Sequence, residues 1–415
     1  MRIALIADPD SPHTRAWVDA FAAAGDRVEL FSPYKQVPAL DLPATITVPL
    51  ARARPRRAAP GAGRDIRAGA RDRAPAAPPR DPRKLRALTR ALRLVPAVRG
   101  WLRDVRPDRL IALRFQPEGY LASAGGFRPY ALVSWGQDVL RFARAHPLHL
   151  LWSAHAARRA ALLLGETDAV VAALRGLGGR PDRCQHGLTG IDVEHWSAAR
   201  HEADPLAPLR ACAAPNAPWL AALEEGAPLI LSPRAVAPNG HQRQLVRAVG
   251  RGNEAARDAG GLPPLLLQVG PGDAGERALC QDLARQLGLT ARYYDLGRVP
   301  RAALRSLYVR ATVVCSLWAP DGLSQTLLEC MAAGALPLVA DLPGNREWIE
   351  PGVNGLLADP TQPEQLAAAL ARAQQDGALR DRARAENPAR VRARATRHEQ
   401  MARLVAMIHT LEAKR

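Results

Sequence analysis

Short apolar runs alternate with amphipathic helical stretches along most of this chain of 415 residues. An apolar run at 3–7 is followed by a helical pattern over about 11–24 and by a second predicted strand at 27–31. Near the other end, an apolar run at 311–317 leads into a helical pattern over 324–333. Continuous apolar runs between helices are typical of strands buried in a parallel sheet. The pattern therefore predicts an α/β protein built from strand–helix–strand units.

Changes of composition divide the chain into four parts. We expect a first domain over 1–201, a connection rich in proline and alanine over 202–227, a second domain over 228–386 and a final helical segment over 387–415. The pair Asn387–Pro388 predicts a break before the last helix, because proline disrupts a helix interior. The length is sufficient for two domains, each with its own core.

The cysteines and the amino terminus indicate where the protein works. The five cysteines are odd in number and contain no Cys-x-x-Cys pair, so we expect neither a disulfide framework nor a structural zinc site. The first apolar run is too short for a signal peptide, and no stretch approaches the roughly 20 apolar residues that cross a bilayer. We therefore expect a cytoplasmic protein, either soluble or peripheral at the inner face of the membrane.

Two carboxylates flank a Gly-Leu-Ser turn that opens the helix at 324–333. In an open parallel sheet, ligands bind at the carboxyl ends of the strands, where helix N-termini point their free amides outward. Asp321 and the amides of Gly322, Leu323 and Ser324 are therefore expected to face a ligand. Glu329 lies about one to two turns into the helix, where a carboxylate can accept both hydroxyls of a ribose.

Each carboxylate also has a simpler interpretation. Asp321 alone would be expected to cap the helix, and Glu329 alone to be a solvated helix residue. However, Glu329 lies in the apolar run Leu327–Met331, where an unpaired exposed carboxylate would be unusual and a buried one needs a partner. This context favours a binding site.

The same region resembles the retaining glycosyltransferases of family four. That family carries Glu-x7-Glu, followed by Met-Ala-x-Gly-x-Pro-x-Val, Pro-Gly-x-x-Glu and Gly-x-Asn-Gly-Leu-Leu. This chain has Asp321-x7-Glu329 and then matching segments at 331–339, 343–347 and 352–357. The resemblance implies the GT-B fold, in which two Rossmann-like domains face each other across a cleft and the last helix crosses back onto the first domain.

The resemblance also implies roles in binding the donor. Strands that end at Arg234 and Gly270 are similar to two strand ends of the family. In the family, the arginine and a lysine five residues later hold the donor diphosphate, but here the later position is Asn239. A guanidinium can grip phosphate with two parallel donors, so Arg234 can act without that lysine. Asp321, shorter by one methylene than the family's glutamate, is assigned to the donor sugar, and Glu329 to the ribose.

The first domain supplies fewer candidates. His13, in the loop after the first strand, is expected to contact phosphate or acceptor, with a structural role at a helix start as the alternative. The segment from Trp135 to Asp138 resembles a Trp-Gly-Ser-Asp segment of some family members, which makes Asp138 a candidate catalytic or acceptor-side residue and puts Trp135 at the cleft. The alternative for Asp138 is a helix cap. The histidines do not have metal-ligand spacing, so we expect no metal.

Most of the net charge of +17 lies in a basic insertion over 51–109, which holds 18 Lys and Arg against 5 Asp. Its first half is rich in Pro, Gly, Ala and Arg, and its second half predicts a basic amphipathic helix over 81–105, divided or kinked at Pro96. A solvated helix face, an anionic membrane surface and a nucleic acid are three possible explanations. Nucleic acid is disfavoured, because no aromatic residue interrupts 51–100 to stack on a base.

These features together predict an enzyme, a retaining glycosyltransferase that moves a sugar from a nucleoside-diphosphate sugar to a sugar or lipid-linked acceptor without a further cofactor. Catalysis would rest on Arg234, Asp321 and Asp138. A noncatalytic sugar-nucleotide-binding or assembly subunit is one alternative, because Asp321 and Asn239 replace the family's usual residues. An epimerase of the same architecture is another.

Overall fold

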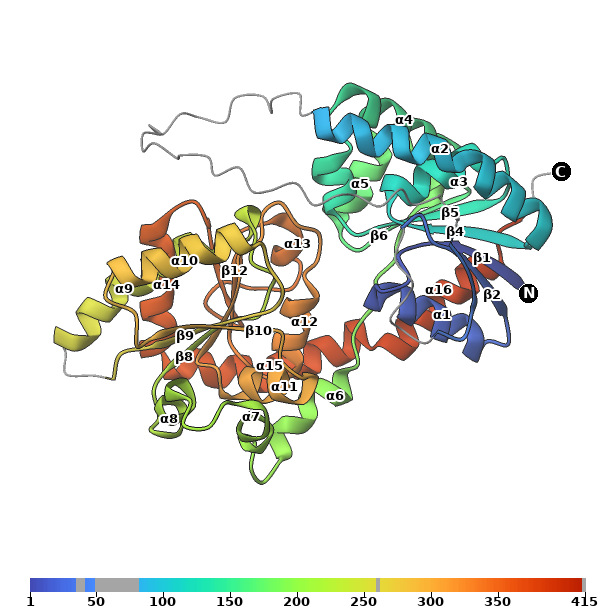
Figure 1. Ribbon diagram of the computed structural model, residues 1–415. Coiled ribbons are helices and arrows are strands. Elements are labelled where there is room, and N and C mark those ends of the chain that lie inside the picture. Colours follow the sequence, from blue (N-terminus) through green and yellow to red (C-terminus); the bar gives the residue numbers. More distant parts are fainter. Residues whose placement is uncertain (35–41, 49–81, 259–261, 413–415) are drawn as a thin grey trace.

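The computed structural model describes residues 1–34, 42–48, 82–258 and 262–412. It contains two α/β domains, which are joined by a connecting segment and by two helices at the C-terminal end of the chain (Figure 1). Both sheets are parallel and carry helices on both faces, so the prediction of two Rossmann-like domains is confirmed. None of the helices in the described ranges has the length and apolarity needed to span a membrane.

The sheet of the first domain has the strand order β3-β2-β1-β4-β5-β6-β7. The apolar residues of its central strands are fully buried, which explains why they read as continuous apolar runs in the sequence. The strands are β1 (Arg2–Ile6), β2 (Arg27–Phe31), β3 (Thr45–Thr47), β4 (Arg109–Leu113), β5 (Tyr130–Ser134), β6 (Leu162–Gly165) and β7 (Cys184–His186).

Helices cover both faces of this sheet. On one face, the helix α1 packs together with α16 from the end of the chain. On the other face lie α2, α3, α4 and α5, with two short turns, η1 and η2, at the carboxyl ends of β4 and β5. The bounds are α1 (Pro12–Ala23), α2 (Pro82–Val105), η1 (Phe115–Gly119), α3 (Tyr120–Gly125), η2 (Asp138–Phe142), α4 (Pro147–Arg159), α5 (Asp168–Gly176), η3 (Pro181–Arg183) and α16 (Arg397–His409).

The second domain has the strand order β10-β9-β8-β11-β12-β13, again between two helical layers. Its strands are β8 (Leu229–Ser232), β9 (Leu265–Val269), β10 (Tyr293–Gly297), β11 (Val313–Ser316), β12 (Pro337–Ala340) and β13 (Leu356–Ala358). Its helices are η5 (Pro238–Gly240), α9 (Gln242–Asp258), α10 (Ala274–Gln286), α11 (Arg301–Arg310), α12 (Gln325–Ala332), α13 (Pro343–Arg346), α14 (Pro363–Gln375) and α15 (Gly377–Ala395).

The connection between the domains begins earlier than the sequence predicted. Ile191, Val193 and Trp196 are buried in the core of the second domain, although they precede the expected boundary at residue 201. The connection is also folded, and its helices contribute Leu209 and Trp219 to the same core. Its elements are α6 (Val193–Ser197), η4 (Ala198–His201), α7 (Ala207–Cys212) and α8 (Pro218–Glu224).

The predicted helix break at Asn387–Pro388 is wrong, because α15 continues through Pro388 to Ala395. Proline lacks the N–H that would bond the carbonyl of Arg384, four residues earlier, and Arg200 donates to that carbonyl instead, at 3.2 Å. The break lies at Thr396, which pairs with Ile191 in an isolated β-bridge. The last helix, α16, then crosses back onto the first domain as predicted (Figure 1).

The basic helix predicted over 81–105 is present as α2, with Pro96 inside it. Its side chains at Leu88, Val98 and Leu102 are buried as the apolar spacing predicted, but Leu92 is 49% exposed. Most of the first half of the basic insertion lies outside the described residues.

We expect Leu404→Ala in α16 to lower the free energy of unfolding by about 2–5 kcal/mol, because it removes a buried side chain from the core shared with α1. Urea denaturation measures this loss, and Arg403→Ala, at an exposed position of the same helix, is the control. An unchanged midpoint for Leu404→Ala would show that α16 does not support the first domain.

Candidate active site

Two glycines bring the domains into backbone contact at the cleft. Gly136 follows β5 and has a φ of +89°, and a Cβ atom there would lie 2.4 Å from the Cα atom of Gly322 in the loop after β11. A Cβ atom at Gly322 would in turn lie 3.0 Å from the carbonyl oxygen of Trp135. The carboxyl ends of the two sheets therefore face each other at this point, which is where open sheets bind ligands.

An ion pair organises the second domain's side of the cleft. Nη1 of Arg234, which follows β8, lies 2.6 Å from Oδ2 of Asp321 and donates to Oγ of Ser324 at 2.8 Å and of Ser316 at 3.3 Å. The guanidinium also lies 4.9 Å from the centre of the Trp318 ring. No described residue accepts a hydrogen bond from its Nε or Nη2, so these donors are available to a ligand. The structure thus brings together three of the predicted donor-side residues.

Glu329 is partly shielded on α12, and its partner is Tyr308 from α11. The tyrosine hydroxyl donates to Oε2 of Glu329 at 3.0 Å. Burial raises the pKa of Glu329 to about 7, although this hydrogen bond and the charges of Arg301, Arg397 and Arg234 oppose the rise. The carboxylate is therefore neither a solvated surface residue nor an orphan, and it titrates close to neutral pH.

The roles of the remaining predicted donor-side residues, Gly270, Gly322, Leu323 and Asn239, stay predictions, and the contacts found for three of them involve the backbone. Gly270 has a φ of +128°, in the range that favours glycine, and a Cβ atom there would lie 3.1 Å from the backbone of Arg234. The amide of Gly322 donates to Oδ1 of Asp321 at 3.0 Å, and the Leu323 side chain is buried in the core. The carbonyl of Asn239 accepts a hydrogen bond from the amide of residue 319 at 3.1 Å.

On the first domain's side, His13 in the first turn of α1 stacks on Trp135 with ring centres 4.4 Å apart. Its Nδ1 lies 3.4 Å from the side-chain nitrogen Nε2 of Gln325, on the other side of the cleft. Burial, and then the charges of Arg397 and Arg114, lower the pKa of His13 to about 4, so the ring is neutral at physiological pH. Both residues that sequence analysis placed at the cleft therefore lie there.

Asp138 is held inside its own domain. Its Oδ1 accepts hydrogen bonds from Ser134 Oγ at 2.7 Å and from the amide of Val139 at 3.1 Å, and its Oδ2 accepts one from the amide of Phe115 at 3.0 Å. Burial nevertheless raises its pKa. Asp138 therefore ties η1 to η2, whereas the helix cap expected as its alternative role is absent, since the residue at the N-cap of η2 is Gln137. A catalytic role for Asp138 stays a prediction.

Arg114, which directly follows β4, was missed by sequence analysis. It has a φ of +105° in a region that only glycine adopts readily, and such strain is concentrated at functional sites. Its guanidinium lies 4.9 Å from the Trp135 ring, and its Nη2 donates to Tyr34 Oη at 3.0 Å and to Glu118 Oε1 at 3.4 Å. Burial raises the pKa of Glu118 to about 7. The position immediately after a buried strand was the available signal.

Glu166, which directly follows β6, was also missed by sequence analysis, although it too comes immediately after a buried strand. It is 8% exposed, and no described residue donates a hydrogen bond to its carboxylate. Burial, followed by the negative charges of Asp321 and Asp138, raises its pKa to about 8. The cleft therefore holds a carboxyl group that is mostly neutral at pH 7.

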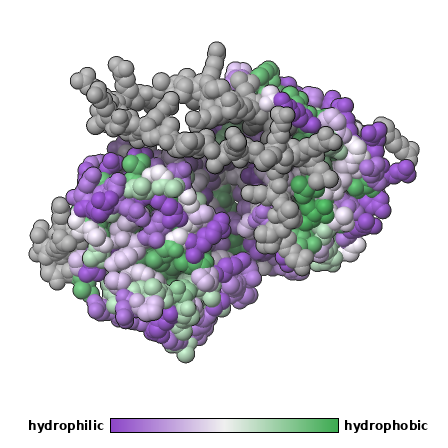
Figure 2. Space-filling view, viewed as in Figure 1, coloured by the Kyte–Doolittle hydropathy of each residue, from purple (hydrophilic) through white to green (hydrophobic). Residues whose placement is uncertain are grey.

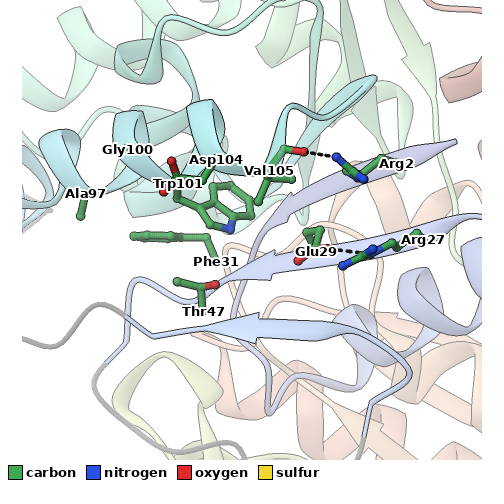
Figure 3. A pocket seen from close by; sticks show the side chains of 10 residues that line it. All are labelled: Arg2, Arg27, Glu29, Phe31, Thr47, Ala97, Gly100, Trp101, Asp104 and Val105. Carbon is green, nitrogen blue, oxygen red and sulfur yellow. Dashed lines mark hydrogen bonds and ion pairs between the residues drawn. The ribbon is translucent and has the colours of Figure 1, made fainter.

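Two hollows open on the first domain. One, of about 470 Å³, lies at the cleft and is lined by Arg114, Trp135, Asp138, Phe142 and His149 among others. The other, of about 610 Å³, lies between α2 and the sheet edge formed by β1, β2 and β3 (Figure 3).

Three of the charged groups that line the larger hollow, Arg2, Arg27 and Glu29, already have partners. Arg27 bonds Glu29 at 2.9 Å, and Arg2 donates to the carbonyl of Val105 at 2.6 Å (Figure 3). Arg2 and Arg27 also begin their strands, so this part of the hollow lies away from the carboxyl ends that face the cleft. The smaller hollow is therefore the better candidate for a substrate site.

The second domain matches a known family. Residues 221–390 match the family model described as glycosyl transferases group 1. The matched residues include Arg234, Asp321 and Glu329, so the cluster described above lies within the region that resembles this family. Over 118 residues the chain is also 35% identical to an uncharacterized glycosyltransferase of Methanocaldococcus jannaschii, a match that covers 28% of this chain and 29% of that relative.

Similar solved structures extend over both domains. HepE of Anabaena, in complex with UDP and glucose, has a TM-score of 0.68 at 16% identity and covers 98% of each chain. Sucrose-phosphate synthase of Thermosynechococcus elongatus has a TM-score of 0.73 at 18% identity over 99% of this chain and 98% of that one. A UDP-forming trehalose-phosphate synthase of Burkholderia xenovorans has a TM-score of 0.71 at 15% identity over 99% of both chains. The predicted GT-B fold is confirmed.

We expect Glu166→Gln to stabilise the free protein at high pH. The folded-state pKa of about 8 exceeds the ordinary value of 4.5, so ionising Glu166 costs folding free energy that grows as the pH rises from 4.5 to 8. The variant should be more stable than the wild type by about 2–4 kcal/mol at pH 8.5, with no difference at pH 4.5. Thermal unfolding across this pH range, with exposed Glu386→Gln as control, measures the effect; equal profiles would contradict it.

Proposed function

We propose that this protein is a retaining glycosyltransferase that moves a sugar from a nucleoside-diphosphate sugar to an acceptor held by the first domain. The observation that carries the proposal is the cluster of Arg234, Asp321 and Ser324 at the cleft, within the region that resembles the group 1 family and also holds Glu329. Structures of similar fold include one described in complex with UDP and glucose, which agrees with this donor class.

The donor diphosphate would lie against Arg234. Asp321 and the two serines fix one edge of the guanidinium, so Nε and Nη2 point their paired N–H groups at phosphate without further ordering. The lysine expected five residues later is replaced by Asn239, and the positive charges of Arg301 and Arg397, which act on Glu329, compensate for it in part. Glu329 would accept hydrogen bonds from the ribose hydroxyls, held in position by Tyr308.

Transfer would proceed on one face of the donor sugar. The bond from the anomeric carbon to the diphosphate breaks, the acceptor oxygen bonds that carbon on the same face, and the acceptor proton passes to the departing phosphate oxygen. Arg234 would stabilise the charge that develops on the leaving group. Asp321 keeps a second acceptor position on each oxygen for a sugar hydroxyl. We propose no metal or other cofactor, since arginines serve the phosphate.

The acceptor would enter the smaller hollow beside Trp135 and Arg114. A sugar or a lipid-linked sugar is our proposed acceptor class, and we propose that the protein works in the cytoplasm, with the basic insertion over 51–109 attracted to anionic membrane lipid. Nucleic acid is not a proposed partner. Neutral His13, stacked on Trp135, would close the cleft over the donor.

We expect the wild type to bind one nucleotide among UDP, GDP, ADP, TDP and CMP, and Glu329→Ala to weaken that binding roughly 10- to 100-fold, because it removes hydrogen bonds to a charged group. Isothermal titration calorimetry measures both, and Glu386→Ala is the matched surface control. If none of the five nucleotides binds to the wild type, the assignment of a nucleotide-sugar donor fails.

A noncatalytic binding or assembly subunit would bind the nucleotide but would not cleave the nucleotide sugar. We therefore expect slow release of nucleoside diphosphate from the matching nucleotide sugar in wild type, and at least a tenfold slower release in Arg234→Ala, because Arg234 stabilises the leaving group. Product analysis would identify an epimerase, which converts the sugar without releasing the diphosphate. Binding without any release would favour the noncatalytic subunit.

A further inference from the structure

Apolar side chains that face solvent gather on one part of the first domain. The described residues include nine large apolar side chains that are exposed, and four of these lie within the ten positions 142–151. They are Phe142, Leu148, Leu150 and Leu151, and we call them the apolar rim. Leu151 alone is 67% exposed. Elsewhere the exposed apolar residues are scattered, and the face drawn in Figure 2 is a mixture of hydrophilic and hydrophobic residues.

The rim follows from how α4 is packed. One side of this helix is buried through Ser153, Ala156 and Ala157, which contact the core beneath the sheet. Its first turn extends beyond that core, so Leu148 and Leu151, three positions apart, lie together on the free side. The three exposed leucines of this turn, Leu148, Leu150 and Leu151, are largely turned to solvent, so packing within the first domain does not account for them.

The charge around the rim has one sign. No Asp or Glu occurs between Asp138 and Glu166, while this stretch holds four arginines. Arg141 and Arg144 flank Phe142, and both are exposed. Exposed apolar side chains beside arginines, in a stretch of sequence without acidic residues, are typical of surfaces that enter the headgroup region of an anionic bilayer.

The rim continues into the hollow at the cleft. Phe142 is 43% exposed and also lines the cavity of about 470 Å³. The same cavity reaches Trp135 and Arg114, which lie at the carboxyl ends of the strands. A ligand lying in it could therefore have an apolar end at the surface and a polar end at the cleft.

We infer that the apolar rim inserts into an anionic lipid bilayer and presents the neighbouring cavity to an acceptor that is anchored in that bilayer. The second half of this inference rests on the proposed transferase function, and the first half does not. It adds a second membrane contact to the proposed one at the basic insertion, at a patch that joins the substrate cavity.

Sedimentation with vesicles tests the contact. We expect the full chain to bind vesicles of phosphatidylcholine with phosphatidylglycerol and to bind pure phosphatidylcholine weakly. Leu148→Ser/Leu151→Ser should weaken binding to the anionic vesicles by roughly tenfold or more, because two apolar side chains no longer enter the interface. The control is Leu262→Ser/Leu279→Ser, which changes two exposed leucines of the second domain (53% and 46% exposed, against 43% and 67% for Leu148 and Leu151). Equal losses in both double variants would overturn the inference.

Insertion must be separated from attraction of the basic insertion to the same vesicles. A Leu151→Cys variant labelled with an environment-sensitive fluorophore, in a Cys212→Ser background that removes the exposed native cysteine, reports the environment of the rim. We expect a blue shift with anionic vesicles, and none for label at Leu279→Cys on the second domain. Sedimentation without a blue shift at position 151 would show that the basic insertion binds alone, and would overturn the inference.

A second copy of the chain is the other occupant that could cover the rim. Analytical ultracentrifugation of wild type and of Leu148→Ser/Leu151→Ser decides this, because a dimer that the substitutions dissociate would assign the rim to self-association and overturn the inference. Nucleotide binding by the double variant should equal that of wild type. If the double variant loses vesicle binding but keeps nucleotide binding, the result supports the role of the rim. If the wild type binds no nucleotide, the proposed function fails, and the membrane contact is judged separately.

Discussion

The close approach of two backbone loops, at Gly136 and Gly322, is the constraint on which the cleft depends. A Cβ atom at Gly136 would lie 2.4 Å from the other loop, so this position tolerates no side chain in this arrangement. A Cβ atom at Gly322 would lie 3.0 Å from the opposite loop, which would have to shift to make room for it. The contact fixes the separation of the two sheets at their carboxyl ends. It thereby brings His13 to Gln325 and puts Glu166 within electrostatic reach of Asp321. The short distance between these two loops therefore determines which charged and polar groups of the two domains lie close together in the cleft.

A narrow cleft concentrates charge in a region with little water. Asp138, Asp321 and Glu166 come from both domains, and only the first two have hydrogen-bond donors among the described residues. Since Asp321 is paired with Arg234 and Asp138 is held by three donors, the unfavourable energy falls on Glu166, whose pKa is raised to about 8 by burial and by the charges of Asp321 and Asp138. The neutral imidazole of His13 fits the same environment, because burial, and then the charges of Arg397 and Arg114, disfavour its proton.

The sequence predicted what local pattern and spacing can encode. Alternating apolar runs and helices indicated two parallel sheets, and the segment from Asp321 to Glu329 indicated the loop and helix that hold the donor-side cluster. Arg114 and Glu166 were not predicted, because each is a single polar residue after a strand and becomes informative only when folding brings it next to Trp135 or Asp321. The prediction of a helix break at Pro388 was wrong for a related reason, because it depends on a residue far away in the sequence. The hydrogen bond that Pro388 cannot donate to the carbonyl of Arg384 is replaced by one from Arg200, which lies 184 positions before Arg384 in the sequence.

The distribution of contacts between the domains indicates how the cleft can open. Across the cleft the contacts are polar and few, such as His13 to Gln325 and the amide of Asp168 to Glu347 at 2.9 Å. At the opposite end the chain crosses twice, and Ile191 and Thr396 pair there, with the amide of Arg397 donating to the carbonyl of Ile191 at 2.9 Å. Separating the polar contacts costs little, whereas α16 is bound to the first domain by buried apolar side chains. Opening would therefore be a rotation about Ile191 and Thr396 in which α16 moves with the first domain. Arg234, Asp321 and Glu329 all lie on the second domain, so their arrangement would persist while the cleft is open, and a donor could bind before the domains close.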